Sequence, residues 1–470
     1  MEFAFGVVLA RLLVPADFGM IITIQVFTGF IGALTSGGMG QALIRAKEVD
    51  EHDFYAVFTL QLAIGFLVYI AFFLVAPWFA EYFGNPLYSD LMRVSALFFL
   101  IRPFAFMRIS WLNREMNFKT RSMITVATGA VTGISSILMA IAGFGVWSLT
   151  LSGLVAGVFR NILLARYTPL KLRLNFDTSV MRKHSSYGFK IIVNDLLSHI
   201  KTELTKLIMS KLGGPAFLGL FNKADSLNRV PFEMVGSPVN QTVFRAMSKV
   251  QDDLDQTKYM FYRVVTLLMV YVLPFYVGLW WLAEPFISVV YGEKWLPAVE
   301  PLRILTGASF CFIIGYPCGV VLMAQNRLTQ EMLAQTANLV VGVAACVIGI
   351  NWGLAGVAWG FLFSQIFGVV YFYVLVYQTI PTKLVDLAMA IAPGLLLNIL
   401  LFLVLGATDY VVGDLRNTKP LAYMLAMFFP AVLTYLMAFL FIPFPGLKTE
   451  VDRWREKIAV VLGFVYKNAA

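Results

Sequence analysis

Long apolar segments follow one another along almost the whole chain, and they constrain the fold more than any other feature. A helix that crosses a bilayer needs about 20 predominantly apolar residues. These segments are continuous apolar runs rather than the alternating segments of an outer-membrane barrel, so they favour helices. The expected spans are residues 1–13, 19–44, 54–77, 90–113, 119–142, 145–166, 185–211, 216–243, 259–283, 299–324, 329–350, 354–377, 384–405 and 420–442. The sequence therefore predicts an all-α polytopic membrane protein with about 14 transmembrane helices.

Composition excludes the other broad classes. Of the 470 residues, 59% are apolar and 13% are charged, whereas a soluble domain is near half apolar and about a quarter charged. The three cysteines, Cys311, Cys318 and Cys346, lie in apolar runs and are too few for a disulfide scaffold. The sequence has no Gly-rich phosphate loop ending in Gly-Lys-Ser/Thr and no His/Cys cluster with metal spacing. We therefore expect neither a cofactor nor a metal.

Lysine and arginine are concentrated in alternate loops, which predicts the orientation of the chain. The basic loops lie at residues 45–47, 114–121, 166–183, 245–263, 327, 383 and 448–467. The opposite loops contain Lys294, Arg416 and Lys419, with Arg11 and Lys211 at helix ends. Because cytoplasmic loops carry the excess of basic residues, we expect the C-terminus in the cytoplasm. This bias accounts for most of the net charge of +9, so no nucleic-acid partner is expected.

The chain repeats its own landmarks at a nearly constant offset. Pro77 and Gly84 match Pro285 and Gly292, and Arg93 matches Arg303. Further matched pairs are Pro15-Ala16 with Pro215-Ala216, Asn113-Arg114 with Asn326-Arg327, and Gly145-Val146 with Gly356-Val357. Glycine and proline recur at helix ends in any case, but a coherent offset across several landmarks favours duplication.

Duplication predicts two six-helix lobes with pseudo-twofold symmetry. An even number of helices in each half gives both halves the same orientation, so their axis would run along the membrane normal, with a site between them near the midplane. The expected parts are an N-terminal lobe at 1–166, a cytoplasmic linker at 167–184, a C-terminal lobe at 185–377, two appended helices at 384–442 and an interfacial amphipathic tail at 447–467.

Several motifs resemble those of Wzx-type polysaccharide exporters, which belong to the superfamily of multidrug, oligosaccharidyl-lipid and polysaccharide (MOP) transporters. The opening Arg11-Leu-Leu-Val-Pro-Ala-Asp-Phe-Gly19 is similar, as is Gly143-Phe-Gly-Val-Trp147. The most specific motifs are Phe244-Arg-Ala-Met-Ser-Lys-Val-Gln-Asp-Asp253 and Tyr291-Gly-Glu-Lys-Trp-Leu-Pro-Ala298. The resemblance extends over nearly the whole chain.

The resemblance implies a flippase rather than an enzyme. Its implied cargo is an undecaprenyl-diphosphate-linked oligosaccharide, moved by alternating access across the bacterial inner membrane for O-antigen or exopolysaccharide assembly. The implied partners are membrane lipids, a polysaccharide polymerase and chain-length proteins. In contrast to the family pattern, only about thirteen residues form the span before Pro15, and they reach roughly 20 Å, short of a core of about 30 Å. This departure predicts a truncated or mis-assigned start.

Charged residues inside the expected spans are candidates for a site, because charge in hydrocarbon is costly unless it faces water or a partner. On the span 185–211, Asp195, His199 and Lys206 share one face, and Asn194 shares another with Lys201. On the span 216–243, Asp225, Arg229 and Glu233 are spaced i, i+4 and i+8, and Asn222 and Lys223 precede them. This stripe fits either a wet cavity or a neutralised structural ladder.

A diphosphate cargo would require cations, because Arg and Lys bind phosphate oxygens. The expected substrate-binding residues are Lys201, Lys206, Arg102, Arg108, Lys223, Arg229, Asn194 and Asn222. Asp195, His199, Asp225 and Glu233 are candidates for coupling to an ion. Arg102 precedes Pro103, whose missing N–H leaves a carbonyl that Arg102 could bind. Arg93 and Arg303 fit either the cavity or anchoring at the headgroups.

Two other classes remain as alternatives. A MATE-like exporter of cationic drugs would need an acidic cavity, whereas the excess charge within the spans is basic. A membrane-embedded glycosyltransferase would need acidic catalytic residues with a metal, or a large periplasmic loop. Adjacent genes for glycosyltransferases and a polymerase would distinguish the exporter of lipid-linked sugars from both.

Overall fold

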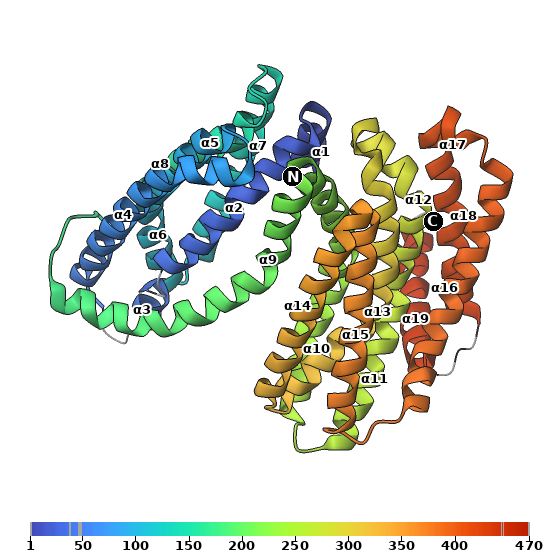
Figure 1. The fold of residues 1–470 in the computed structure, drawn as a ribbon. Helices are drawn as coiled ribbons and strands as arrows, with labels where there is room; N and C mark the ends of the chain where they lie inside the picture. The colour runs from blue at the N-terminus through green and yellow to red at the C-terminus, as the bar shows by residue number, and fades with distance from the viewer. Residues whose placement is uncertain (1, 37–38, 46–48, 443, 445, 469–470) are drawn as a thin grey trace. The chain divides into compact units, whose positions relative to one another are not determined.

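A computed structural model describes residues 2–36, 39–45, 49–442, 444 and 446–468 of the chain. Within them it describes no side chains at residues 2, 33–36, 41–42, 45, 182–202, 237, 240–242 and 461–468. All regular structure in these ranges is helical, and no strand occurs in them. The expected all-α class is therefore confirmed (Figure 1).

The chain forms two compact units, which meet in sequence at residues 220 and 221. The first unit contains α1 (Glu2–Leu12), α2 (Pro15–Ser36), α3 (Met39–Arg45), α4 (Glu51–Phe83), α5 (Leu87–Ala96), α6 (Phe98–Arg114), α7 (Phe118–Ile141), α8 (Trp147–Tyr167) and the first part of α9 (Thr178–Pro231). The helix α9 has a break at Gly214, where φ is 85° and ψ is 173°. The break separates the two expected spans 185–211 and 216–243.

The second unit begins with the end of α9. It continues with the π-helical turn η1 (Phe232–Gly236), α10 (Ser237–Lys249), α11 (Leu254–Tyr271), α12 (Leu273–Val290), η2 (Glu293–Ala298), α13 (Val299–Ala324), α14 (Leu328–Gly349), η3 (Ile350–Trp352), α15 (Gly353–Tyr377), α16 (Leu384–Val412), α17 (Leu415–Thr418), α18 (Pro420–Phe441) and α19 (Lys448–Asn468). Its largest buried cluster includes Phe261, Val265, Leu268, Ile313 and Val321.

Ten stretches of the described helices are long and apolar enough to cross a membrane. One of them, Leu328–Tyr377, contains the two expected spans 329–350 and 354–377. The expected spans at 1–13, 185–211 and 216–243 are not among the ten. The first is too short, the second lies mostly at residues whose side chains the structure does not describe, and the third contains several charged residues. The chain is nevertheless multi-pass, because the ten apolar stretches remain.

Local sequence signals explain where several helices begin and end. The Asp50 carboxylate accepts the backbone N–H of Asp53, and Asp53 accepts that of Asp50, which forms a capping box at the start of α4. Gly84 ends α4 with a left-handed φ of 70°. Asp177 precedes α9 and accepts the backbone N–H groups of Ser179 (2.9 Å) and Val180 (3.2 Å). The first turns of α4 and α9 are thus fixed by side chains outside the spans.

The non-helical segment before α9 is short. It comprises residues 168–177, and α9 begins at Thr178, within the range 167–184 expected to be a linker. The segment packs back on α4, because the backbone N–H of Asn175 donates to the Thr59 hydroxyl at 2.8 Å and its side-chain amide donates to the His52 carbonyl at 3.2 Å.

The turns of the two halves recur in conformation as well as in sequence. Met116 (φ 52°) and Asn326 (φ 56°) are the non-glycine residues with positive φ in the described chain. Met116 follows α6, and Asn326 follows α13. Both turns have the same pattern of backbone hydrogen bonds at the end of the helix. The structure therefore pairs Asn326 with Met116. The expected pairing of Asn113-Arg114 with Asn326-Arg327 was wrong, because it relied on two identical residues rather than on the turn.

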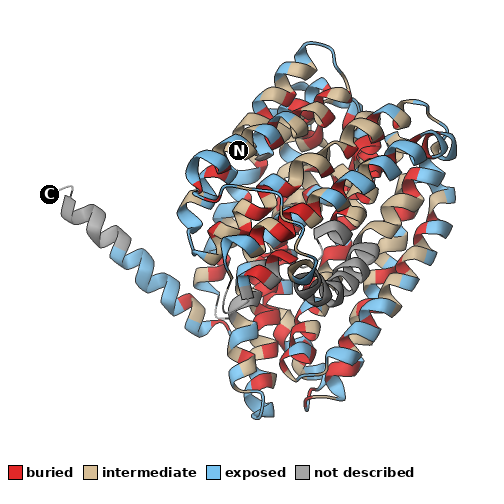
Figure 2. Ribbon diagram, turned by 90° about the vertical axis from the view of Figure 1, so that its left-hand side faces the viewer, coloured by how far each residue is buried: buried red, intermediate tan, exposed pale blue. Residues whose placement is uncertain are grey.

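The final helix α19 lies at the expected tail 447–467 and contacts α11. The Arg263 guanidinium binds the Glu450 carboxylate at 2.7 Å, and the Trp454 indole donates to the Tyr271 hydroxyl at 2.8 Å. After Val451, its described residues up to Val460 are exposed (Figure 2). Such exposure is typical of a helix that lies in a membrane interface.

Candidate functional site

A polar cavity of about 230 Å³ lies in the second unit. The end of α9 and η1 provide one wall, and α12, α13 and α15 provide the others. Its lining residues are Asp225, Asn228, Arg229, Phe232, Glu233, Tyr276, Leu305, Ala308, Ser309, Phe312, Phe361 and Gln365. The structure thus brings together three of the residues that the sequence predicted, Asp225, Arg229 and Glu233.

Hydrogen bonds and an ion pair order one side of this cavity. The Arg229 guanidinium binds the Asp225 carboxylate at 2.9 Å, one helical turn away. The Ser309 hydroxyl donates to the Asn228 side-chain carbonyl at 3.0 Å and so links α13 to α9. The Arg229 side chain remains 62% exposed. Its charge is therefore paired but still accessible from the cavity.

Glu233 lies on a π-helical turn rather than on the regular continuation of α9. The turn follows Pro231, whose ring cannot donate a backbone hydrogen bond. A π-turn rotates the residues that follow it, and such turns are frequent at functional sites. The expected i, i+4, i+8 stripe is therefore interrupted after Arg229, although Glu233 still lines the same cavity.

Lys223 lies in a different environment from the cavity residues. Its ammonium group is 4.3 Å from the centre of the Tyr291 ring and 5.3 Å from that of Trp295. Both aromatic residues are almost completely buried. Both belong to the motif Tyr291–Ala298, so two aromatic rings of this motif make cation–π contacts with the Lys223 ammonium group. Asn222, the preceding residue, is half-buried and does not line the cavity.

The first unit has a cavity of about 240 Å³ at the equivalent place. Gln25 and Thr28 of α2 line this cavity. Their counterparts in the sequence repeat, Asp225 and Asn228, line the cavity of the second unit. Its other lining residues are Ile21, Ile24, Ser95, Phe98, Phe99, Leu149, Thr150, Gly153 and Leu154. Of these two sets of described lining residues, only that of the second unit contains charged side chains.

Three arginines of the first unit, Arg102 and Arg108 of α6 and Arg160 of α8, lie on helices that also contribute to its cavity, but none of the three is among the described lining residues. The Arg102 guanidinium donates to the Gly32 carbonyl of α2 at 2.8 Å and lies 6.0 Å from the centre of the Phe106 ring. This carbonyl lies on α2, a helix distant in sequence from Pro103. Arg102 also lies close enough to Arg160 of α8 for their charges to repel one another.

Arg108 and Arg160 each bury a donor without a partner. In both residues the Nε atom is buried and has no hydrogen-bond partner among the described residues. Next to Arg160, the Asn161 amide donates to the Ile101 carbonyl of α6 at 3.3 Å, and its own carbonyl oxygen is buried without a partner in the same part of the chain. A buried unsatisfied group carries a desolvation cost of about 1–3 kcal/mol. The two Nε–H donors therefore favour a hydrogen-bond acceptor, whereas the Asn161 oxygen favours a donor.

Lys206 has an acidic partner that the sequence analysis did not assign. Its ammonium group lies 2.9 Å from the Glu203 carboxylate, at i and i+3 on α9. The nearest acid expected on its face was Asp195, about three turns away. Helical positions i and i+3 are neighbours, so the pair could have been found from spacing alone. Four further predicted site residues have side chains outside the described part of the chain, namely Asn194, Asp195, His199 and Lys201.

Arg93 and Arg303 make equivalent contacts in the two units. Arg93 donates to the Phe73 carbonyl at 3.4 Å and lies 4.4 Å from the centre of its ring. Arg303 donates to the Trp280 carbonyl at 3.3 Å and lies 5.7 Å from the centre of that ring. Arg303 also binds Glu284 at 3.5 Å. These contacts hold each arginine against its own unit.

Sequence reasoning missed several residues that the structure places at these sites. Arg160 was visible only as a charge within a span, and Asn161, Tyr276, Ser309 and Gln365 were not singled out. These residues lie on helices that are far apart in sequence, so spacing along one helix does not relate them. Only the offset between the two repeats could have done so. In contrast, Asp225, Arg229 and Glu233 were visible because they share one helical stripe.

The apolar helices and the polar groups inside them define a multi-pass α-helical membrane protein. A family model described as "Polysaccharide biosynthesis protein" matches residues 8–300. The chain belongs to this family.

Among curated relatives, the lipopolysaccharide biosynthesis protein WzxC of Escherichia coli is 24% identical over 327 residues, which are 68% of this chain and 66% of that protein. The succinoglycan biosynthesis transport protein ExoT of Rhizobium meliloti is 24% identical over 301 residues, which are 63% of this chain and 60% of that protein. The matched region thus spans about two thirds of the length of these relatives or less. These matches confirm the expected resemblance to Wzx-type exporters.

Solved structures show the same fold. The lipid II flippase MurJ in an inward closed conformation superposes with a TM-score of 0.72 at 16% identity, covering 93% of this chain and 95% of that one. An inward-facing multidrug resistance MATE transporter of the MOP superfamily superposes with a TM-score of 0.63 at 14% identity, covering 80% of this chain and 94% of that one. At such identities the likeness shows the fold alone.

Proposed function

We propose that this protein flips an oligosaccharide linked to undecaprenyl diphosphate across the bacterial inner membrane by alternating access. The observation that carries the proposal lies on α6 and α8, where Arg108 and Arg160 each bury an Nε–H donor that has no partner among the described residues. Family membership supports the same function, as does the relative ExoT, which is named a transport protein.

The chemistry of the cargo matches this arrangement. A diphosphate carries concentrated negative charge, which cannot cross hydrocarbon without compensation. Guanidinium groups present forked donors that fit phosphate oxygens and are less strongly hydrated than ammonium groups. A bound diphosphate would provide acceptors for the buried Nε–H donors of Arg108 and Arg160.

The second polar cavity provides a different set of groups. Asn228, Ser309 and Gln365 offer amides and a hydroxyl, which suit the hydroxyl groups of a sugar. Asp225 and Glu233 can accept a cation or a proton. In this proposal the first unit holds the charged headgroup, and the second unit contributes sugar contacts and coupling to an ion.

The remaining features of the proposal follow from topology. The basic loops and the C-terminal helix α19 lie on the cytoplasmic side of the inner membrane. The two repeated halves form the two lobes, with α16 and α18 appended. The polymerase and the chain-length proteins act on the flipped product. The protein itself performs no covalent step.

The test is complementation of an exporter-deficient strain, together with binding of a lipid-linked diphosphate to the purified protein. Arg160→Gln and Arg108→Gln should each weaken binding by about tenfold or more, because a desolvated charge-assisted contact contributes roughly 1.5–3 kcal/mol. The matched control is Arg166→Gln, at the exposed end of the same helix as Arg160. Full complementation by Arg108→Gln/Arg160→Gln at normal membrane abundance would overturn the assignment of these arginines.

A further inference from the structure

A buried cluster of three hydroxyl groups joins α9 to α2 and α5 in the first unit. The Thr23 hydroxyl of α2 lies 2.6 Å from the Ser210 hydroxyl of α9, and the Tyr88 hydroxyl of α5 lies 3.5 Å from that of Thr23. None of the three residues is more than 3% exposed. They are not among the described lining residues of the two polar cavities, so the sites considered above do not use them.

The direction of each hydrogen bond in the cluster follows from the single proton of each hydroxyl. The Thr23 hydroxyl donates to the Gly19 carbonyl at 2.8 Å, so it has no second proton to give. Ser210 is therefore the donor toward Thr23, and the longer bond from Tyr88 uses the remaining lone pair. All hydrogen-bonding positions of the Thr23 hydroxyl are thus used only while α2, α5 and α9 lie together.

Further contacts hold the same part of α9. A Cβ atom on Gly19 of α2 would lie 1.7 Å from the Pro215 carbonyl oxygen, so the two backbones meet without a side chain between them. Lys211, the residue after Ser210, donates to the Tyr82 carbonyl of α4, and its ammonium group lies 4.0 Å from the centre of the Tyr82 ring. Three helices of the first unit thus contact α9 near this hydroxyl cluster.

The cluster lies where the two repeated halves of the sequence meet. By the repeat, α2 belongs to the N-terminal half, and the span 185–211 opens the C-terminal half. Ser210 precedes the break at Gly214 by about one turn, and Tyr88 lies in the first turn of α5. The break and the turn before α5 are on the side opposite to the basic loops, which is predicted to be periplasmic. The cluster therefore joins the two halves at their periplasmic ends.

We propose that Thr23, Ser210 and Tyr88 form a latch that closes the periplasmic side of the protein and breaks in each transport cycle. The proposal rests on the proposed function, because alternating access requires one side to open while the other is closed. Hydroxyl groups suit such a contact. They bond to one another when buried and to water when the helices separate, so the net free-energy cost of opening is small.

The first test locks the latch with a disulfide. Thr23→Cys/Ser210→Cys replaces two oxygens that lie 2.6 Å apart by sulfurs, whose bonded distance is about 2.05 Å. Oxidation should abolish export in the complementation assay, and a reductant should restore it at unchanged membrane abundance. Peptide mass spectrometry verifies the bond.

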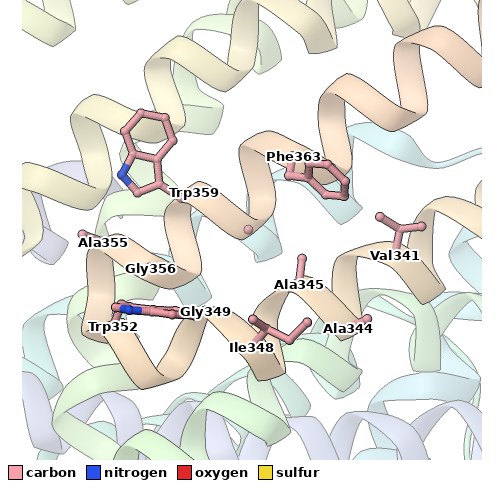
Figure 3. A pocket seen from close by; sticks show the side chains of 11 residues that line it. Val341, Ala344, Ala345, Ile348, Gly349, Trp352, Ala355, Gly356, Trp359 and Phe363 are labelled. Atoms are coloured by element: carbon pink, nitrogen blue, oxygen red, sulfur yellow. The ribbon is translucent and has the colours of Figure 1, made fainter.

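The matched control is a disulfide between two helices of the same half. A Cβ atom on Gly342 of α14 would lie 3.7 Å from the Cβ atom of Ser364 on α15, which is the usual spacing in a disulfide. These two helices pack closely along their length and also meet at Gly349 and Gly356 (Figure 3). Oxidised Gly342→Cys/Ser364→Cys should therefore export normally, because the contact that it fixes does not open.

The second test measures opening without transport, in proteoliposomes. A membrane-impermeant maleimide should label Ser210→Cys slowly, because the thiol is accessible only when the latch is open. Adding Thr23→Val keeps the shape of the side chain and removes its hydroxyl. It should raise the labelling rate roughly threefold, equivalent to about 0.6 kcal/mol, since a thiol is a weak donor. Thr23→Ser retains the hydroxyl and should leave the rate unchanged, and the wild-type protein with its own cysteines is the blank.

Two results would overturn the proposal. Normal export by the oxidised Thr23→Cys/Ser210→Cys protein would show that the contact persists through the whole cycle. A labelling rate that Thr23→Val does not raise would assign the cluster a static structural role. The labelling assay needs no cargo, so the expected labelling in a protein that fails to complement an exporter-deficient strain would count against the proposed function and not against the latch.

Discussion

Gly19 lies against the backbone carbonyl group of Pro215, and Gly219 lies against that of Pro15. A Cβ atom on Gly19 would lie 1.7 Å from the carbonyl oxygen of Pro215, and one on Gly219 would lie 1.9 Å from that of Pro15. The two glycines occupy equivalent positions in the sequence repeat, as do the two prolines. Glycine at both positions thus lets the start of α2 approach residues 215–219 of α9 closely.

The first prediction is that Gly219→Ala lowers export. The added Cβ would overlap a backbone carbonyl, which cannot rotate away, and overpacking of this kind typically costs about 1–3 kcal/mol. Complementation and the melting temperature of the purified protein should both fall. Gly307→Ala is the matched control, because a Cβ on this helical glycine meets nothing within 4 Å. If Gly219→Ala kept wild-type export and stability, α2 and α9 could move apart enough to accommodate the added Cβ, and the prediction would be wrong.

The second prediction concerns Met116, whose left-handed backbone disfavours a side chain with a Cβ. Met116→Gly should raise stability by about 1 kcal/mol, because the left-handed conformation costs roughly 1–2 kcal/mol and glycine loses part of that gain in the unfolded chain. Thermal unfolding in detergent measures the change. Asn326→Gly should have a smaller effect, because asparagine tolerates this conformation. A decrease in stability for Met116→Gly would mean that its side chain contributes more than the turn costs.

The sequence predicted what depends on local pattern, and it missed what depends on contacts between distant helices. Apolar runs located the helices, and the offset between Pro77 and Pro285 anticipated turns that the structure shares between its halves. The same offset could not reveal that Gly19 touches Pro215. Lys223 was expected at a substrate site, but Tyr291 and Trp295 come from a much later part of the chain and surround it. Hydropathy and helical faces contain no information about such a contact.

For the candidate site, too, the sequence predicted local pairs and missed contacts between distant helices. Asp225 and Arg229 could be paired from their spacing on one helix, and the structure shows this pair. The partner of Arg102 was expected next to Pro103, where the chain itself supplies a carbonyl, whereas the structure places the acceptor at Gly32 on α2. Arg160 of α8 lies beside α6 only because these two helices pack together. Side chains that act across helices require the packing, which the sequence does not contain.

The third prediction concerns the pH dependence of the cap on α9. Hydrogen bonds from Ser179 and Val180 lower the pKa of Asp177 from 3.8 to about 2. The ionised form is thus favoured in the fold, so its contribution is complete above about pH 3.8 and is lost as pH falls through about 2. Asp177→Ala should speed amide hydrogen exchange at residues 178–181 equally at pH 5 and pH 8, whereas Asp177→Asn should retain most protection.

This measurement is made in a His52→Gln background, because the His52 ring lies 3.4 Å from the Asp177 carboxylate and is a further partner of it. Ser226→Ala, an exposed hydroxyl farther along α9, is the control. A difference between wild type and Asp177→Ala that disappears between pH 8 and pH 5 would contradict the lowered pKa.

The last prediction separates two roles of Lys206. Its partner Glu203 lies 2.9 Å away, and both side chains are largely buried, at 26% and 18% exposure. Lys206→Met leaves Glu203 without its partner, so a loss of export in this variant could come either from a missing cargo contact or from an uncompensated carboxylate. The double variant Glu203→Gln/Lys206→Met removes both charges and therefore distinguishes the two causes.

If Lys206 only neutralises Glu203, the double variant should recover export and membrane abundance. If Lys206 binds the diphosphate, the double variant should recover abundance while binding of the lipid-linked diphosphate stays about tenfold weaker, because the charge-assisted contact is still absent. The second outcome is expected here, since the proposed cargo needs cations within the membrane. Recovery of binding in the double variant would assign Lys206 a structural role and leave the headgroup to the arginines of α6 and α8.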